Sequence, residues 1–212
     1  IYACILTATA FLDYVIDTWY LQNLAIFFSS MIISVNHMIQ VSDQWLDAKR
    51  ELLISEYRAS HDIMTGLWNK TSGVDQVINC LENMSESDMA VLGFMDIDNF
   101  KSVNDTYGHE FGDQVLIRIA QVLEEECPQQ GYVCRYGGDE FIGFFPYATS
   151  EKAQQYTDRV QSRLTKENIM ISIGVELTFA GGEETIDEYL SLADQNMYRQ
   201  KQMRKESRKN ID

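Results

Sequence analysis

The chain has 212 residues, a net charge of -15 at pH 7 and 45% hydrophobic residues. This length suffices for one well-packed domain with an appendage. The acidic balance argues against a protein that binds nucleic acid nonspecifically, because phosphate backbones require clustered cationic side chains.

Residues 1–40 are predicted to form an apolar helical segment, the end of a membrane or sensory module. No lysine or arginine precedes Lys49, and we expect this segment to be the cut end of a longer protein. The stretch from Leu21 to Ile39 is just long enough to span a bilayer, and Lys49 and Arg50 would mark the cytoplasmic side. Because several polar residues interrupt the stretch, a soluble helical hairpin is the alternative. Asp13 and Asp17 are predicted to lie in a short loop between two helices.

Residues 41–61 read as a helical linker with weak coiled-coil character. Leu46 and Leu53 are seven residues apart, and so are Trp45 and Leu52. Apolar residues at this spacing favour the pairing of two helices. We therefore expect the linker to join two copies of the chain.

Residues 62–212 show interleaved strand and helix patterns and are predicted to be one domain. The predicted elements are a strand at 90–97, helices at about 100–106 and 112–126, a hairpin around 137–138, a helix at about 150–166, a strand at 169–176 and a final helix from about 185. This order suits an α/β (α+β) fold in which helices pack on a mixed sheet.

The strand predicted at 90–97 runs into two acidic residues, Asp96 and Asp98. Alternate residues of a strand share a face, so both carboxylates are expected on one side. The alternative for Asp98 and Asn99 is capping of the following helix.

Gly137, Gly138, Asp139 and Glu140 join two apolar runs that read as a hairpin. The paired glycines permit positive φ and close approach of a ligand to the backbone. If the strand ending at Asp96 lies beside this hairpin, the three acids gather around one or two hard divalent cations such as Mg²⁺. The alternative is an ordinary turn whose acids face water.

Together these motifs resemble those of the GGDEF family of diguanylate cyclases. The resemblance is carried by DIDNFKSVNDTYGHEFGD at 96–113 and RYGGDEF at 135–141, and it extends to DIMTGLWNK at 62–70, SIGV at 172–175 and ADQNMY at 193–198. It covers roughly residues 62 to 205. It implies a ferredoxin-like, polymerase-palm type of mixed sheet with flanking helices.

The resemblance implies that two GTP molecules are condensed into cyclic di-GMP with release of two pyrophosphates. By position, Asp96, the carbonyl of Ile97, Asp139 and Glu140 match the ligands of Mg²⁺ or Mn²⁺. Asp139 would also take the hydroxyl proton, and Lys101 would stabilise negative charge on the phosphates. Since each domain of the family holds one GTP, a homodimer is expected.

The resemblance also assigns a set of substrate-contacting positions: Asn104, His109, Asp113, Gly138, Lys201 and Lys205. The carboxylate of Asp113 can accept hydrogen bonds from N1 and N2 of guanine. Adenine lacks this donor pair, so Asp113 predicts a preference for GTP over ATP. Local hydrogen bonding is the alternative for His109, and a solvated basic tail is the alternative for the two lysines.

The sequence departs from the family pattern in three places. Many members carry an Arg-x-x-Asp site for product inhibition shortly before the hairpin, whereas this chain has the sequence PQQG at 128–131. Without the arginine fork, we predict no product inhibition through that site. Lys70 replaces an arginine, and Arg204 stands where the last helix usually reaches glycine.

The favoured hypothesis is an active diguanylate cyclase that is the output of a sensory protein, attached to the inner membrane with its catalytic domain in the cytoplasm. A wholly cytoplasmic protein is the alternative location. The alternative function is a catalytically inactive regulatory module that binds GTP. A nucleotidyl cyclase that makes adenylate-containing products is a third hypothesis, and Asp113 argues against it.

Overall fold

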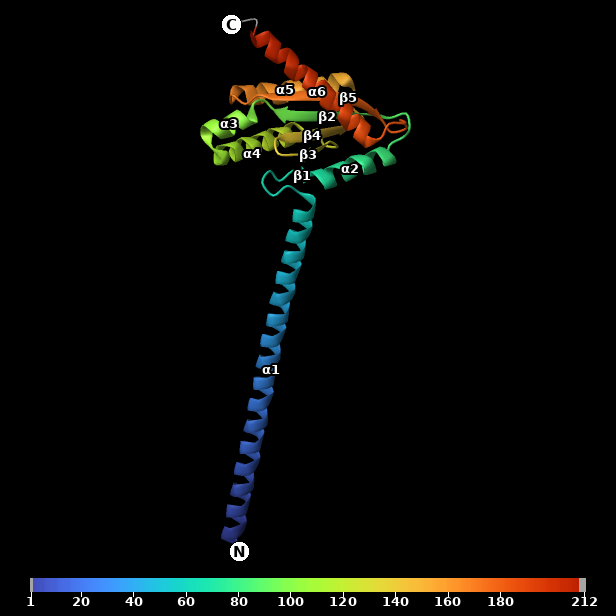
Figure 1. Ribbon diagram of the computed structural model, residues 1–212. Coiled ribbons are helices and arrows are strands. Elements are labelled where there is room, and N and C mark those ends of the chain that lie inside the picture. Colours follow the sequence, from blue (N-terminus) through green and yellow to red (C-terminus); the bar gives the residue numbers. More distant parts are fainter. Residues whose placement is uncertain (1, 210–212) are drawn as a thin grey trace. The chain divides into compact units, whose positions relative to one another are not determined.

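The computed structural model describes the backbone of residues 2–209 and the side chains of residues 6–204 (Figure 1). The chain divides into two compact units, Ile1–Glu56 and Tyr57–Asp212. The structure of each unit is described by itself below.

The helix α1 (Tyr2–Ser60) is continuous over 59 residues. Asp13 and Asp17 lie inside it, so the predicted loop between two helices was wrong. Residues 1–60 contain neither glycine nor proline, the residues that most often interrupt a helix. The polar side chains also find partners within the helix, since Asn23 donates to the carbonyl of Trp19 and Ser29 to that of Ala25.

The second unit is built on a five-stranded mixed sheet of order β1-β3-β4-β2-β5. Its strands are β1 (Trp68–Asn69), β2 (Met89–Ile97), β3 (Tyr132–Arg135), β4 (Glu140–Pro146) and β5 (Ile171–Phe179). β2 pairs antiparallel with both β4 and β5, and β1 pairs parallel with β3. The predicted fold class is confirmed, and β5 begins two residues later than expected.

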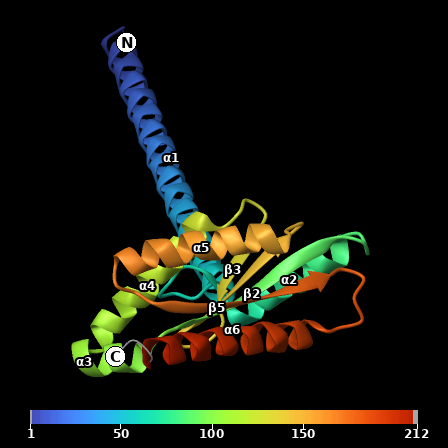
Figure 2. The same cartoon turned by 90° about the horizontal axis from the view of Figure 1, so that it is seen from above.

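Helices cover both faces of this sheet. They are α2 (Lys70–Asn83), α3 (Phe100–Tyr107), α4 (His109–Glu126), α5 (Ser150–Lys166) and α6 (Ile186–Lys209). α4 and α5 share one buried apolar cluster with the sheet, and α2 and α6 share the other. Figure 2 shows α5 and α6 running along opposite sides of β5.

The strand β2 supplies side chains to both cores in alternation. Val91 and Met95 belong to the cluster under α4 and α5, whereas Leu92 and Phe94 belong to the cluster under α2 and α6. Because alternate residues share a face, Asp96 emerges on the side of α2 and α6. The sheet thus directs this carboxylate towards the last helix.

Candidate functional site

Three carboxylates gather where β2 ends and β4 begins. Asp96 is the cross-strand neighbour of Glu140, and Asp139 precedes Glu140 in the chain. Burial raises the pKa of Asp96, with further increases from the charges of Asp139 and Asp98. Burial also raises the pKa of Glu140, and the charges of Asp139 and Asp96 add to this effect. The acids therefore repel one another in a partly desolvated position.

Lys201 of α6 forms an ion pair and a hydrogen bond with Asp96. Both side chains are largely covered, with 20% and 19% of their surfaces exposed. The lysine lowers the pKa of Asp96 and so opposes part of the burial effect. The carboxylate of Asp96 is thus already paired with one cationic group.

The acid cluster has the chemistry, but not the arrangement, of a site for a hard divalent cation. Within residues 6–204, no group of three or more His, Cys, Asp and Glu side chains is arranged so that it could hold a metal ion. The cluster nevertheless supplies carboxylate oxygens, the ligands that Mg²⁺ and Mn²⁺ prefer. Its surplus negative charge also favours a cation. The chemistry of the donors therefore suits such an ion, although their arrangement here is not that of a metal site and Lys201 occupies one oxygen of Asp96.

The turn that presents Asp139 is held by Arg135. Its guanidinium donates to the carbonyl of Gly138 from Nε at 3.2 Å and from Nη2 at 2.7 Å. The same guanidinium lies 3.1 Å from the carboxylate of Asp62. A Cβ added at Gly138 would meet nothing within 4 Å. The backbone of this turn is therefore open to the approach of a ligand.

The expected use of positive φ in this turn was wrong. Among the glycines in the described part of the chain, only Gly66 and Gly108 adopt positive φ. A Cβ added at Gly137 would instead lie 2.4 Å from Oε2 of Glu140. The first glycine of the motif therefore serves to leave room for the Glu140 carboxylate.

Lys70 is a neighbour of the acid cluster that was not among the predicted site residues. Its ammonium lies 3.9 Å from the centre of the Tyr136 ring, and its charge lowers the pKa of Glu140 against the burial effect. In the sequence, Lys70 stood out only because it replaces an arginine that is common in the GGDEF family.

Asp98 does not cap the helix α3, so the capping alternative was wrong. Its Oδ1 accepts a hydrogen bond from the hydroxyl of Ser172 at 2.7 Å, and its Oδ2 lies 3.9 Å from Nη1 of Arg204. Asn99 stands at the N-cap position with φ 57, but its side chain makes no capping bond. These contacts tie the end of β2 to β5 and α6.

A second polar position lies between α3 and α4. Oδ1 of Asn104 is buried and has no hydrogen-bond partner. It packs against Gly112, where an added Cβ would come within 1.9 Å of it. A buried oxygen without a partner is costly and uncommon, and it can accept a hydrogen bond from a ligand or a water molecule. Asp113, which follows Gly112, is half-buried.

Among the described side chains, the structure gives no hydrogen bond or ion pair between the remaining predicted residues and the two positions described above. Lys101 is exposed on α3 and His109 is exposed at the first position of α4. Ile97 ends β2, and its side chain belongs to the core. The side chain of Lys205 lies outside the described residues.

Comparison with known proteins gives consistent matches. The sequence profile described as "Diguanylate cyclase, GGDEF domain" matches residues 59–207. Diguanylate cyclase DosC of Escherichia coli K12 is 27% identical over 183 residues, which cover 78% of this chain and 39% of that protein. Diguanylate cyclase DgcM of the same strain is 34% identical over 158 residues, which cover 69% of this chain and 37% of that protein. The chain thus spans about two fifths of the length of these relatives.

The fold agrees with a solved structure as well. The crystal structure of the GGDEF domain of DgcB from Caulobacter crescentus, in complex with c-di-GMP, has a TM-score of 0.63 and 27% sequence identity. The match covers 68% of this chain and 91% of that one. The profile match includes the acid cluster, the glycine turn and the polar position between α3 and α4. The chain therefore belongs to the GGDEF domain family of diguanylate cyclases.

Proposed function

We propose that this chain is an active diguanylate cyclase that condenses two GTP molecules into cyclic di-GMP. The observation that carries the proposal is the gathering of Asp96, Asp139 and Glu140 at adjoining strand ends. Inactive relatives would be expected to lack one of these acids or a glycine of the turn, and here all are present.

The acid cluster is proposed to hold Mg²⁺ or Mn²⁺. Asp96, the carbonyl of Ile97 and Asp139 would be ligands, with Glu140 beside the same ions. When bound, the metal neutralises phosphate charge and makes the attacking hydroxyl more nucleophilic. Asp139 would accept the proton of that hydroxyl. Lys201, relieved of its pairing with Asp96, would then be available to a phosphate oxygen.

The polar position between α3 and α4 is proposed to bind guanine. The unpartnered oxygen of Asn104 requires a donor, and the amino group of guanine supplies one. The Asp113 carboxylate accepts from N1 and N2 of the same base. Lys101, His109, Gly138 and Lys205 complete the proposed contacts, with Lys101 stabilising charge on the phosphates as the transition state forms.

The helix α1 is proposed to attach the catalytic domain to the inner membrane. It contains a stretch long and apolar enough to cross a bilayer, and the described residues of that stretch are exposed. Lys49 and Arg50 follow the apolar part, which would place the catalytic domain in the cytoplasm. A soluble helix that pairs with another chain would show the same exposure, and is the alternative.

The proposed reaction is tested by incubating the full chain with GTP and Mg²⁺ and detecting cyclic di-GMP by mass. We expect product from the native chain and none from Asp139→Ala. The matched control is Asp105→Ala, which removes an exposed acid of α3 and should leave product formation intact. No product from a folded, dimeric native chain would contradict catalysis and would favour a regulatory module that binds GTP.

A further inference from the structure

A row of side chains on α6 closes the free edge of the sheet. Nδ2 of Asn196 donates to the carbonyl of Val175 at 3.0 Å, and Oε1 of Gln200 accepts from the amide of Ile173 at 3.3 Å. Nη1 of Arg204 donates to the carbonyl of Ile171 at 2.7 Å. β5 is the last strand of the sheet, so these bonds satisfy backbone groups that have no neighbouring strand.

The geometry of the two elements explains why this row is regular. Helix residues four apart are separated by about 6 Å along the axis, and strand residues two apart by about 6.7 Å. The spacing along α6 therefore nearly equals the spacing along β5, so that successive side chains at 196, 200 and 204 reach successive backbone groups at 175, 173 and 171. Such a match fixes how far α6 can slide along β5.

A second row on α6 packs over the face of the sheet. Ala193 and Met197 lie directly on Gly174, where an added Cβ would come within 2.2 Å of the Ala193 carbonyl oxygen. Lys201 is the next member of this row, four residues further on, and it pairs with Asp96. In sequence Lys201 lies between Gln200 and Arg204, so two edge bonds flank the lysine that serves the acid cluster.

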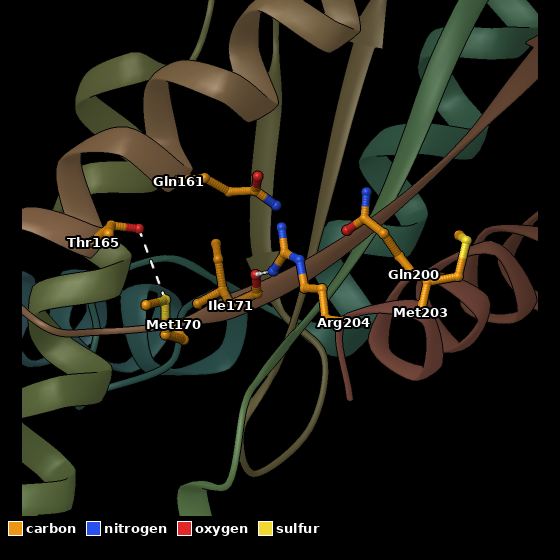
Figure 3. A pocket seen from close by; sticks show the side chains of 7 residues that line it. All are labelled: Gln161, Thr165, Met170, Ile171, Gln200, Met203 and Arg204. Atoms are coloured by element: carbon orange, nitrogen blue, oxygen red, sulfur yellow. Dashed lines mark hydrogen bonds between the residues drawn. The ribbon is translucent and has the colours of Figure 1, made fainter. Parts of the chain in front are cut away.

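Arg204 is the last member of the row among the residues with described side chains. The family commonly has glycine at this position, and glycine has no side chain to reach Ile171. Figure 3 shows the Arg204 guanidinium at the Ile171 carbonyl, on the wall of a cavity of about 420 Å³ between α5, β5 and α6. Gln161 of α5 points towards it. Arg204 also lies 3.9 Å from Asp98, two residues beyond Asp96.

We propose that Gln200 and Arg204 are positioning residues that fix α6 along the edge of β5 and thereby hold Lys201 over Asp96. Their effect on GTP rests on the proposed function, in which Lys201 binds a phosphate. Their effect on the Lys201–Asp96 pair does not depend on it.

The first test is a double-mutant cycle on the unfolding equilibrium of the full chain without nucleotide. Lys201→Met should lower the folding equilibrium constant about tenfold in the native background, and about threefold or less in Arg204→Ala, because the pair is then already loosened. Arg204→Lys, which can still donate to Ile171, should restore most of the difference. If Arg204→Ala does not fold, Gln200→Ala, which loses the bond to Ile173, replaces it in the cycle. Equal factors in both backgrounds would overturn the proposal.

The second test measures steady-state kinetics with GTP and Mg²⁺. Arg204→Ala should raise KM about three- to tenfold and change kcat less than about twofold, since a lost ground-state contact weakens binding uniformly. Gln200→Ala should act likewise, whereas Gln202→Ala, on an exposed position of the same helix, should match the native chain. A fall in kcat at unchanged KM would overturn the positioning role. If the native chain makes no product, the proposed function fails, and the unfolding cycle alone decides this inference.

Discussion

Asn104 and Gly112 lie against each other at the proposed base-binding position. The buried amide oxygen of Asn104 occupies the space that a side chain at position 112 would need. Glycine at 112 is therefore required by packing against the Asn104 side chain, and not by backbone conformation, since its φ is not positive. The absence of a Cβ at position 112 thus leaves room for the amide oxygen of Asn104, which has no hydrogen-bond partner among the described residues.

Gly112→Ala is predicted to lower the affinity for GTP. The new methyl group would displace Asn104, and the loss of one or two hydrogen bonds to the base corresponds to about a tenfold or larger rise in Kd. Equilibrium binding of GTP to the full chain measures the effect. Gln114→Ala, on the exposed side of the same helix, is the control and should bind like the native chain. Unchanged affinity in Gly112→Ala would contradict the assignment of Asn104 to the base.

At the scale of elements, Arg135 links the β3–β4 turn to the segment that follows α1. It donates to Gly138 in the turn and to Asp62, and Asp62 in turn accepts from the backbone and hydroxyl of Thr65. Burial raises the pKa of Asp62, but these hydrogen bonds and the arginine charge outweigh it and lower the pKa below the ordinary 3.8. The ionised carboxylate is thus the form that stabilises the fold.

Asp62→Asn is predicted to destabilise the domain in a pH-dependent way. Because the folded pKa is lowered, the stabilisation is present above about pH 3.8 and is lost as the pH falls through the folded pKa. We expect a cost of about 1–2 kcal/mol at pH 7, within the range for a partly covered charged hydrogen bond. Urea unfolding of both chains at pH 7 and pH 3 measures it.

Two results would distinguish this account from a general effect of charge. Asp75→Asn removes an exposed acid on α2 and should change stability by less than about 0.5 kcal/mol at either pH. If Asp62→Asn were as stable as the native chain at pH 7, the link through Arg135 would carry no energy. A gap that stayed constant down to pH 3 would exclude the carboxylate as its source.

The elements that were predictable are those with long periodic patterns. The helix at 150–166 and the strand ending near Ile97 lie where the pattern placed them. The two-residue β1 is too short to give a pattern, and α2 was not predicted. The pairing of Asp96 with Glu140 followed from expecting β2 beside the hairpin. The partners of Asp98 and Arg204 could not be predicted, because they depend on how far α6 extends along β5.

At the scale of the whole molecule, α1 presents many apolar side chains to solvent. Leu46 and Leu53 are 44% and 55% exposed, and Trp45 and Leu52 are 60% and 58% exposed. Apolar residues that recur every seven positions on one helix form a stripe that a second helix can cover. Each catalytic domain is proposed to hold one GTP, so pairing of two chains through this stripe would supply the second substrate.

Leu46→Glu is therefore predicted to weaken both dimer formation and cyclic di-GMP synthesis. A buried, uncompensated charge in the paired stripe raises the dimer dissociation constant. A loss of about 1.4 kcal/mol in the free energy of dimer formation raises this constant about tenfold. Light scattering of the full chain should show monomers at concentrations where the native chain is dimeric, and the rate per chain should recover as protein concentration rises. Gln44→Glu adds the same charge two positions away and should leave both measurements unchanged. A monomeric Leu46→Glu chain with the native rate at every concentration would contradict the need for pairing through the linker.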